Sequence, residues 1–226
     1  MLKRSLMLIA VTSTWLITPQ PSLAALSLQA KTTSQKIVSK QFNAADAFSI
    51  QSASLRSLML ALYECQPQDL QKSTKVSKEE FVQWVFEGPF DWKFDAIKNT
   101  KSIEALTLSF SQEYQGDHVL PLIAGLYTML LQAYGGENEF TFNESINPQK
   151  LTIAAQNVEV GRTKLHNTRR ESNAFNLNEA CSANVQQKLA KIIEKLLGDY
   201  KVITKAARSN PSAPKIDNDS NEFIKF

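Results

Sequence analysis

The residues best suited to acid–base or metal chemistry are few and widely separated. The chain has only two histidines, His118 and His166, and their separation matches no short metal-binding repeat such as His-x-x-x-His. We therefore predict no metal site, no cofactor and no catalytic residue. Asp117 and His118 begin an apolar run, where such a pair is typical of a helix cap. A hydrolase that uses Asp117, His118 or Glu159 is the alternative.

A dense group of aromatic residues is a second candidate for function. Six of them fall within fourteen residues: Phe81, Trp84, Phe86, Phe90, Trp92 and Phe94. A short helix cannot bury them all, so two interpretations stay open. Either a loop folds over the core, or a partly exposed groove takes an apolar ligand, a glycan or a peptide. In the second case Trp84, Phe90 and Trp92 are the predicted contacts.

Basic residues gather where a predicted helix ends, and they are Arg162, Lys164, His166, Arg169 and Arg170. Cations at this position complement the negative end of the helix dipole, which is a purely structural interpretation. The functional alternative is an anionic partner, such as a lipid head group, a polyanion or an acidic protein face. Arg162, Arg169 and Arg170 are the residues predicted to contact it.

The first 24 residues have the pattern of an export signal. Lys3 and Arg4 precede an apolar run over residues 6–17, and Ser22-Leu23-Ala24 supplies the small residues that a signal peptidase recognises. We predict cleavage before Ala25 and a periplasmic or secreted protein.

The charge balance narrows the choice of partner. Removing Lys3 and Arg4 from the 25 basic residues leaves 23 against 22 acidic ones. This balance argues against nucleic acid, whose binding depends on neutralised phosphates. No second apolar run reaches the roughly 20 residues of a membrane span, so we predict no transmembrane segment in the mature chain. An envelope protein or an apolar or anionic ligand is the expected partner.

The chain has two cysteines, Cys65 and Cys181. In the oxidising compartment that the export signal predicts, an even pair forms a disulfide that persists. The alternative is two separate buried thiols. On the chain-entropy model, a bridge over so long a loop stabilises by about 4–5 kcal/mol.

Helical periodicity predicts an all-α, single-domain bundle of about five or six helices over residues 43–206. A flexible polar leader is expected over residues 25–42 and a disordered tail over residues 207–226. The helices at the centre should be a buried one over residues 119–134 and one over residues 149–168. A helix over residues 180–206 should pack against both.

Local signals set several boundaries. Pro67 should end a first helix that starts near Asn43, and Ser77 with Glu80 forms a capping box for a helix over residues 78–87. Residues 97–110 fit a helix or a strand. Residues 139–142 are predicted to be a short extended connection and not part of a sheet.

Small residues predict how the two central helices meet. Ala124 and Gly125 on the first, with Ala154, Ala155 and Gly161 on the second, would let the two backbones approach closely. We therefore predict that residues 119–134 and 149–168 pack directly against each other.

The segment from Asp117 to Leu126 (DHVLPLIAGL), with Ala133-Tyr134, Glu139-Phe140 and the run Pro148 to Glu159, resembles a group of uncharacterised exported proteins of proteobacteria. The resemblance covers about residues 117–160. It implies a location in a bacterial envelope, and it transfers no functional residue because the group carries no established activity.

These observations favour an exported envelope protein that acts as a non-enzymatic binding or interaction module. The aromatic segment over residues 81–94 and the basic residues around Arg169 are its expected surfaces. A hydrolase and a purely structural envelope subunit are the two alternatives.

Overall fold

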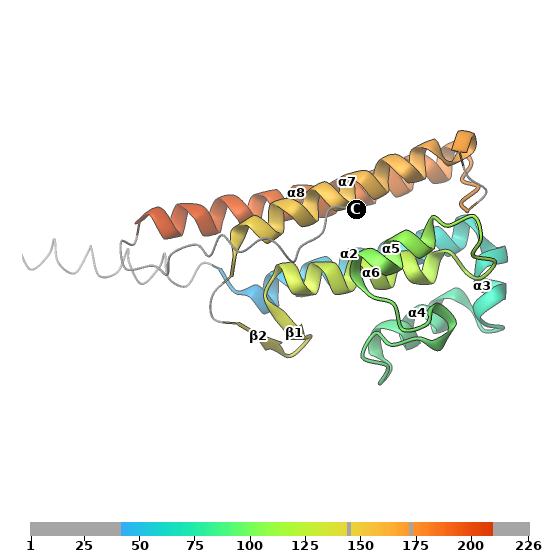
Figure 1. Cartoon of the computed structure of the whole chain (residues 1–226), viewed down its shortest axis with the longest axis horizontal. Coiled ribbons are helices and arrows are strands. Elements are labelled where there is room, and N and C mark those ends of the chain that lie inside the picture. The colour runs from blue at the N-terminus through green and yellow to red at the C-terminus, as the bar shows by residue number, and fades with distance from the viewer. Residues whose placement is uncertain (1–41, 144–145, 172–173, 210–226) are drawn as a thin grey trace, which may run out of the picture. The chain divides into compact units, whose positions relative to one another are not determined.

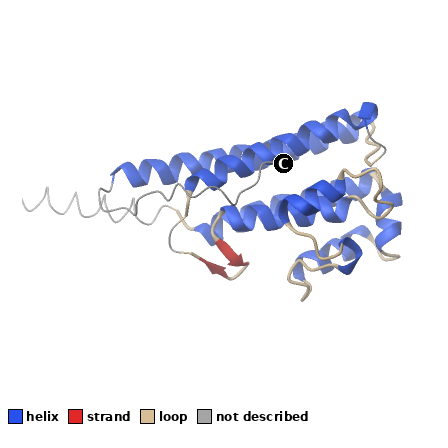
Figure 2. Ribbon diagram, in the orientation of Figure 1, coloured by secondary structure: helices blue, strands red, loops and turns tan. Residues whose placement is uncertain are grey.

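A computed structural model describes residues 42–143, 146–171 and 174–209 (Figure 1). The predicted export signal, its cleavage site before Ala25, the leader up to residue 41 and the tail from residue 210 lie outside these residues. Within the described residues, the chain forms seven α-helices, one 3₁₀ turn and a two-stranded sheet (Figure 2). The all-α fold class and the single domain are confirmed.

Local chemistry explains the boundaries of the first three helices, of which the second was not predicted from the sequence. Helix α2 (Ala44–Cys65) is capped by Asn43, whose Oδ1 accepts from the Ala45 N–H at 2.9 Å. Pro67 ends α2 and also opens α3 (Pro67–Ser73), because a proline fits the first helical position. Helix α4 (Lys78–Glu87) follows the predicted cap, in which Ser77 Oγ accepts from the Glu80 N–H at 3.2 Å.

The segment whose type stayed open is helical. After α4 the chain forms the 3₁₀ turn η1 (Asp95–Ile97) and helix α5 (Ser102–Ser109). The backbone around η1 is unusual, because five residues other than glycine have positive φ angles: Asp91, Trp92, Lys98, Asn99 and Ser102.

Helix α6 (Val119–Ala133) is the buried centre of the bundle, and Gln132 is its one exposed residue. The predicted role of Gly125 was wrong, because this glycine faces α5 and not α7. A Cβ at Gly125 would lie 2.8 Å from Leu106 Cγ and 2.8 Å from the Ser102 carbonyl oxygen. The glycine is therefore needed for close packing of α5 on α6.

A small hairpin replaces the extended connection predicted after α6. Strand β1 (Gly136–Asn138) pairs antiparallel with β2 (Thr141–Phe142), and Gly136 lies opposite Phe142. The prediction of no sheet here was wrong. Gly135, with a φ of 77°, turns the chain out of α6 and accepts from the Asn143 N–H at 2.9 Å, which closes the hairpin.

The last two helices are long and lie side by side (Figure 1). Helix α7 (Pro148–Glu171) starts at Asn147, whose Oδ1 accepts from the Gln149 N–H at 2.9 Å. Helix α8 (Glu179–Ser209) starts in the same way at Asn178. Because α8 continues to Ser209, the prediction of a disordered tail was wrong for residues 207–209.

Buried hydrogen bonds join α8 to α2 and to the end of α6. The Gln51 side-chain amide donates to the Ile192 carbonyl at 3.2 Å, and the Tyr134 hydroxyl donates to Asp199 at 2.6 Å. Cys65 and Cys181 lie at bonding distance, with an S–S separation of 2.10 Å, so the predicted disulfide joins the end of α2 to the first turn of α8.

Candidate functional site

An open pocket lies where the aromatic segment meets α6 and the hairpin. Its volume is about 230 Å³. Helix α4 and the loop after it contribute Val85, Phe86, Gly88, Pro89, Asp91 and Trp92. Helix α6 contributes Tyr127 and Leu131, and the hairpin contributes Asn138, Glu139 and Phe140. We call this site the aromatic pocket.

The inner wall of the aromatic pocket is a pair of stacked rings. Trp92 and Tyr127 lie with their ring centroids 3.7 Å apart and their planes within 18° of parallel, and both are buried. Phe86 packs edge-on against Trp92, with centroids 5.1 Å apart. The core behind this wall holds the two rings in place.

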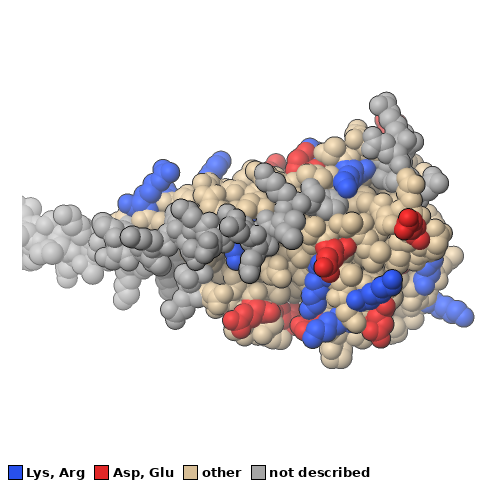
Figure 3. All heavy atoms as spheres, viewed as in Figure 1, with Lys and Arg blue, Asp and Glu red and all other residues tan. Residues whose placement is uncertain are grey.

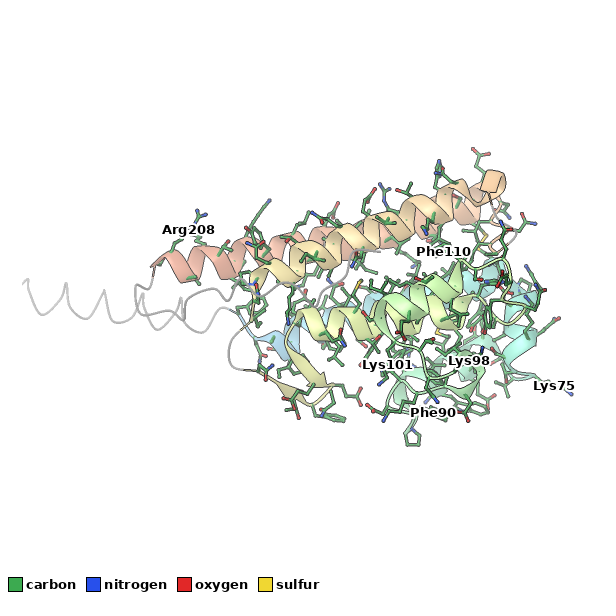
Figure 4. The ribbon with its side chains drawn as sticks, in the orientation of Figure 1. Lys75, Phe90, Lys98, Lys101, Phe110 and Arg208 are labelled. Carbon is green, nitrogen blue, oxygen red and sulfur yellow. A yellow bond between two sulfur atoms is a disulfide. The ribbon has the colours of Figure 1, made fainter. Side chains whose placement is uncertain are left out.

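The aromatic segment over residues 81–94 has both buried and exposed members, so each of the two interpretations applies to part of it. Trp92 is buried, with 7% of its surface exposed, whereas Trp84 and Phe90 are 46% and 43% exposed. Figure 4 shows Phe90 at the lower edge of the described part, in the loop after α4. Of the three predicted contacts, only Trp92 lines the aromatic pocket. Trp84 and Phe90 lie outside it.

The loop that carries Trp92 is held in a strained conformation. Asp91 and Trp92 have φ angles of 47° and 56°, which place both in the left-handed region. A bulky residue there costs on the order of 1–2 kcal/mol, so the packing around it must hold it in place. Such outliers concentrate at functional sites, and this one forms the wall of a pocket.

Two carboxylates stand at the mouth of the aromatic pocket and differ in their partners. Asp91 lies 3.1 Å from Lys93 Nζ and 3.9 Å from Lys101 Nζ. Lys101 and Lys98 both lie in the segment between α4 and α5, and Figure 4 labels them. Glu139 accepts one long hydrogen bond, from the Tyr127 hydroxyl at 3.4 Å, and forms no ion pair with any described residue. Its carboxylate is exposed and available.

The ring of Tyr127 belongs to the buried wall, and its hydroxyl donates to the exposed carboxylate of Glu139. Burial, with a smaller contribution from the charge of Glu139, raises the pKa of Tyr127 to about 12. The hydroxyl is therefore protonated at neutral pH and acts as a donor toward Glu139.

A second group of polar residues lies where α2, α3 and the start of α6 meet. We call it the Asp117 cluster, and it comprises Tyr63, Asp69, Lys72, Ser73 and Asp117. Asp117 is buried and accepts from the Tyr63 hydroxyl at 2.6 Å and from Ser73 Oγ at 2.7 Å. It also accepts from the Val119 N–H at 2.8 Å, which caps α6 as the sequence predicts.

The side chains of the Asp117 cluster bond one another and nearby backbone groups. Lys72 Nζ lies 2.8 Å from Asp69 and donates to the Gly116 carbonyl at 3.1 Å. Burial raises the pKa of Asp117, and its hydrogen bonds from Tyr63, Ser73 and Val119 act in the opposite direction. The arrangement is compact and internally satisfied, which is typical of a structural network.

The three residues of the hydrolase alternative do not meet. His118 is buried, and its Nδ1 donates to the Ser109 carbonyl at 2.9 Å, while its ring packs against Tyr114 and Phe175. Glu159 lies on α7 and pairs with Arg162 at 2.6 Å. The described residues contain no group of three His, Cys, Asp or Glu side chains placed to hold a metal ion.

The basic residues predicted to bind an anion are only partly described. Arg162 forms a fork with both oxygens of Glu159, at 2.7 and 2.6 Å, and also donates to Gln186 at 3.2 Å. The hydrogen bonds from Arg162 lower the pKa of Glu159. The side chains of Arg169 and Arg170 lie outside the described residues. Basic and acidic side chains intermingle over the lower half of the face in Figure 3.

The pocket residues outside the aromatic segment 81–94 were missed from the sequence, and they are Tyr127, Leu131, Asn138, Glu139 and Phe140. Tyr127 lies in an apolar run that predicts a buried helix and nothing more, while Glu139 and Phe140 were assigned to a connection. The missing signal was the hairpin, which returns the chain toward α4. Phe140 is 87% exposed, and this degree of exposure cannot be read from a single aromatic in a short loop.

No protein-family model matches the chain, and neither a curated protein nor a solved structure matches it. The similarity to exported proteobacterial proteins therefore stays a prediction. Among the helices of the described residues, none is both long enough and apolar enough to cross a lipid bilayer.

Proposed function

We propose that this protein is an exported binding module whose aromatic pocket takes a ring-sized apolar group of its ligand. The observation that carries the proposal is the open pocket of about 230 Å³ with the stacked Trp92 and Tyr127 as its wall. Ligand sites are typically concave, mostly apolar and formed in advance, with a few polar groups at the rim. The aromatic pocket is concave and its lining is mostly apolar, with Asp91, Asn138 and Glu139 as its polar residues.

The exposed hairpin residue supports binding over a purely structural role. A phenylalanine that serves only the core is buried, whereas Phe140 is 87% exposed and lines the mouth of the pocket. Phe140 adds to the apolar lining of the pocket, and a largely apolar lining is typical of ligand sites. A ligand in the pocket would cover Phe140 and remove this apolar surface from water.

The proposed location in an envelope or outside the cell has two supports. One is the predicted export signal over residues 1–24, and the other is the disulfide between Cys65 and Cys181. Disulfides persist mainly in oxidising compartments.

The proposal is tested by calorimetric titration with 2-phenylethanol, an uncharged probe with one ring. We expect saturable binding to the wild-type protein and an affinity at least fivefold lower for Phe140→Ala, because truncation removes one wall of the pocket. Trp84→Ala is the matched control, since Trp84 is an exposed aromatic outside the pocket. The absence of binding, or an equal loss in both variants, would contradict the proposal.

A further inference from the structure

The volume of the aromatic pocket limits the size of what it can take. A cavity of about 150 Å³ holds a benzene molecule. A volume of about 230 Å³ therefore suits one ring that carries a short substituent. Large lipids and extended glycans exceed this volume, so the enclosed part of the ligand is a small ring-bearing group.

The two carboxylates at the mouth decide which charge the substituent can carry. Asp91 has two lysine neighbours, and Lys101 also donates to the Asp91 carbonyl at 2.9 Å, so this carboxylate is compensated within the loop. Glu139 has no cationic partner among the described residues, and its one hydrogen bond is long. Glu139 is thus the carboxylate at the mouth that lacks a cationic partner among the described residues, so a cation placed against it gains a local attraction and an anion a local repulsion.

The aromatic wall also favours a cationic ligand. Trp, Tyr and Phe rings attract cations through their negative faces, and an ammonium near several rings is stabilised further when water is excluded. Phe86, Trp92 and Phe140 all line the pocket that Glu139 borders. A carboxylate next to aromatic walls is therefore suited to a ligand with a protonated amine on an apolar body.

We infer that the aromatic pocket takes a small organic monocation, a protonated amine carried on one ring, with the amine at Glu139 and the ring against Trp92 and Tyr127. This inference rests on the proposed function and names the ligand class for the same pocket. The amine replaces the long hydrogen bond from Tyr127 with a charge-assisted one. The ring covers the buried pair and contacts Phe140.

The test compares three probes that share one ring and a short chain: 2-phenylethylamine, 2-phenylethanol and 3-phenylpropionate. Calorimetric titration of the whole protein at neutral pH and low salt should give an affinity about 5 to 10 times higher for the amine than for the alcohol. The carboxylate probe should bind more weakly than the alcohol. Added salt should reduce the preference for the amine, because Glu139 is exposed.

A pair of variants assigns the preference to one carboxylate. Glu139→Gln removes the charge and keeps the size of the side chain, so it should bring the affinity for the amine down to that for the alcohol measured on the same variant. Glu137→Gln is the matched control, because Glu137 is an exposed carboxylate on the same hairpin that does not line the pocket. It should keep the preference.

The outcomes separate the two proposals. If the alcohol and the amine bind equally to the wild type, or if Glu139→Gln keeps the preference, the cationic ligand class is wrong while the pocket still binds a ring. If no probe binds, the proposed function fails together with the inference.

Discussion

Two carboxylates, one on each side of helix α6, differ in their burial and in their hydrogen bonds. Asp117, just before the helix, is buried and accepts short hydrogen bonds of 2.6 and 2.7 Å from Tyr63 and Ser73. Glu139, in the hairpin after the helix, is exposed and accepts one bond of 3.4 Å from Tyr127. Each carboxylate accepts from a tyrosine hydroxyl. Asp117 accepts short hydrogen bonds from several groups, whereas Glu139 accepts a single long one from a side chain.

The difference follows from burial. A buried polar group that lacks partners costs free energy, so a network such as the Asp117 cluster is closed by its own side chains. Glu139 and Phe140 are exposed, and the proposed function assigns them to contact with a ligand.

Loss of the disulfide should have the largest effect on stability. Cys65→Ser combined with Cys181→Ser frees a loop with a sequence separation of 116 residues. The chain-entropy model predicts a free energy of unfolding lower by about 4–5 kcal/mol, which chemical denaturation measures. Because the bridge lies outside the aromatic pocket, probe affinity of the folded variant should not change. A loss below 1 kcal/mol would contradict the assigned role of the disulfide.

Removal of the Asp117 carboxylate should lower the free energy of unfolding much more than removal of the Glu139 carboxylate. Asp117→Ala leaves the buried Tyr63 hydroxyl without its acceptor and removes the cap of α6, so we expect a loss of about 2–4 kcal/mol. Glu139→Ala should change stability by no more than about 0.5 kcal/mol, since it is a surface substitution. Equal losses of stability in Asp117→Ala and Glu139→Ala would contradict the assignment of Asp117 to a structural network and of Glu139 to the surface.

The pH dependence of stability should report the burial of Asp117. Burial raises its pKa above the ordinary value of 3.8, so the folded state holds this proton more tightly than the unfolded state does. The stabilisation is complete below pH 3.8 and is lost as the pH rises through the folded-state pKa. The wild-type free energy of unfolding, relative to Asp117→Asn, should fall over this window by at most about 1.4 kcal/mol per pH unit. A rise would contradict this assignment.

Strain in the loop beside the aromatic pocket should produce the smallest effect. Lys98 is exposed and has a φ of 54°, a conformation that glycine adopts without cost. We expect Lys98→Gly to be more stable by about 0.5–1 kcal/mol. The control is Lys75→Gly, at an exposed position without a positive φ, and it should be slightly destabilised. Equal effects in both variants would contradict strain at Lys98. Figure 4 labels both lysines.

Helices α2, α4, α6, α7 and α8 were predictable because each is encoded locally. Asn43, Ser77, Asn147 and Asn178 cap their helices as single-residue signals predict, and the apolar run of α6 predicts a helix buried on all sides. The disulfide followed from the even number of cysteines and the predicted compartment.

The packing partners and the pocket depended on contacts between distant segments, and local patterns do not encode these. Gly125 suits close packing with any helix, and only the tertiary fold places α5 against it. Trp92 reaches Tyr127 because the loop adopts positive φ angles that its residue types do not favour. Glu139 joined the site through a hairpin of two very short strands, which carries too little alternation to predict.

The most direct test of the aromatic pocket is an NMR titration of the ¹⁵N-labelled protein with 2-phenylethanol, observed at the tryptophan indole N–H signals. Trp92 lies in the pocket wall, and Trp84 is exposed outside it, so one spectrum contains both the site and its control. We predict that the Trp92 signal shifts and saturates while the Trp84 signal stays in place. A shift confined to Trp84, or no shift at either residue, would contradict the assignment of the pocket as the binding site.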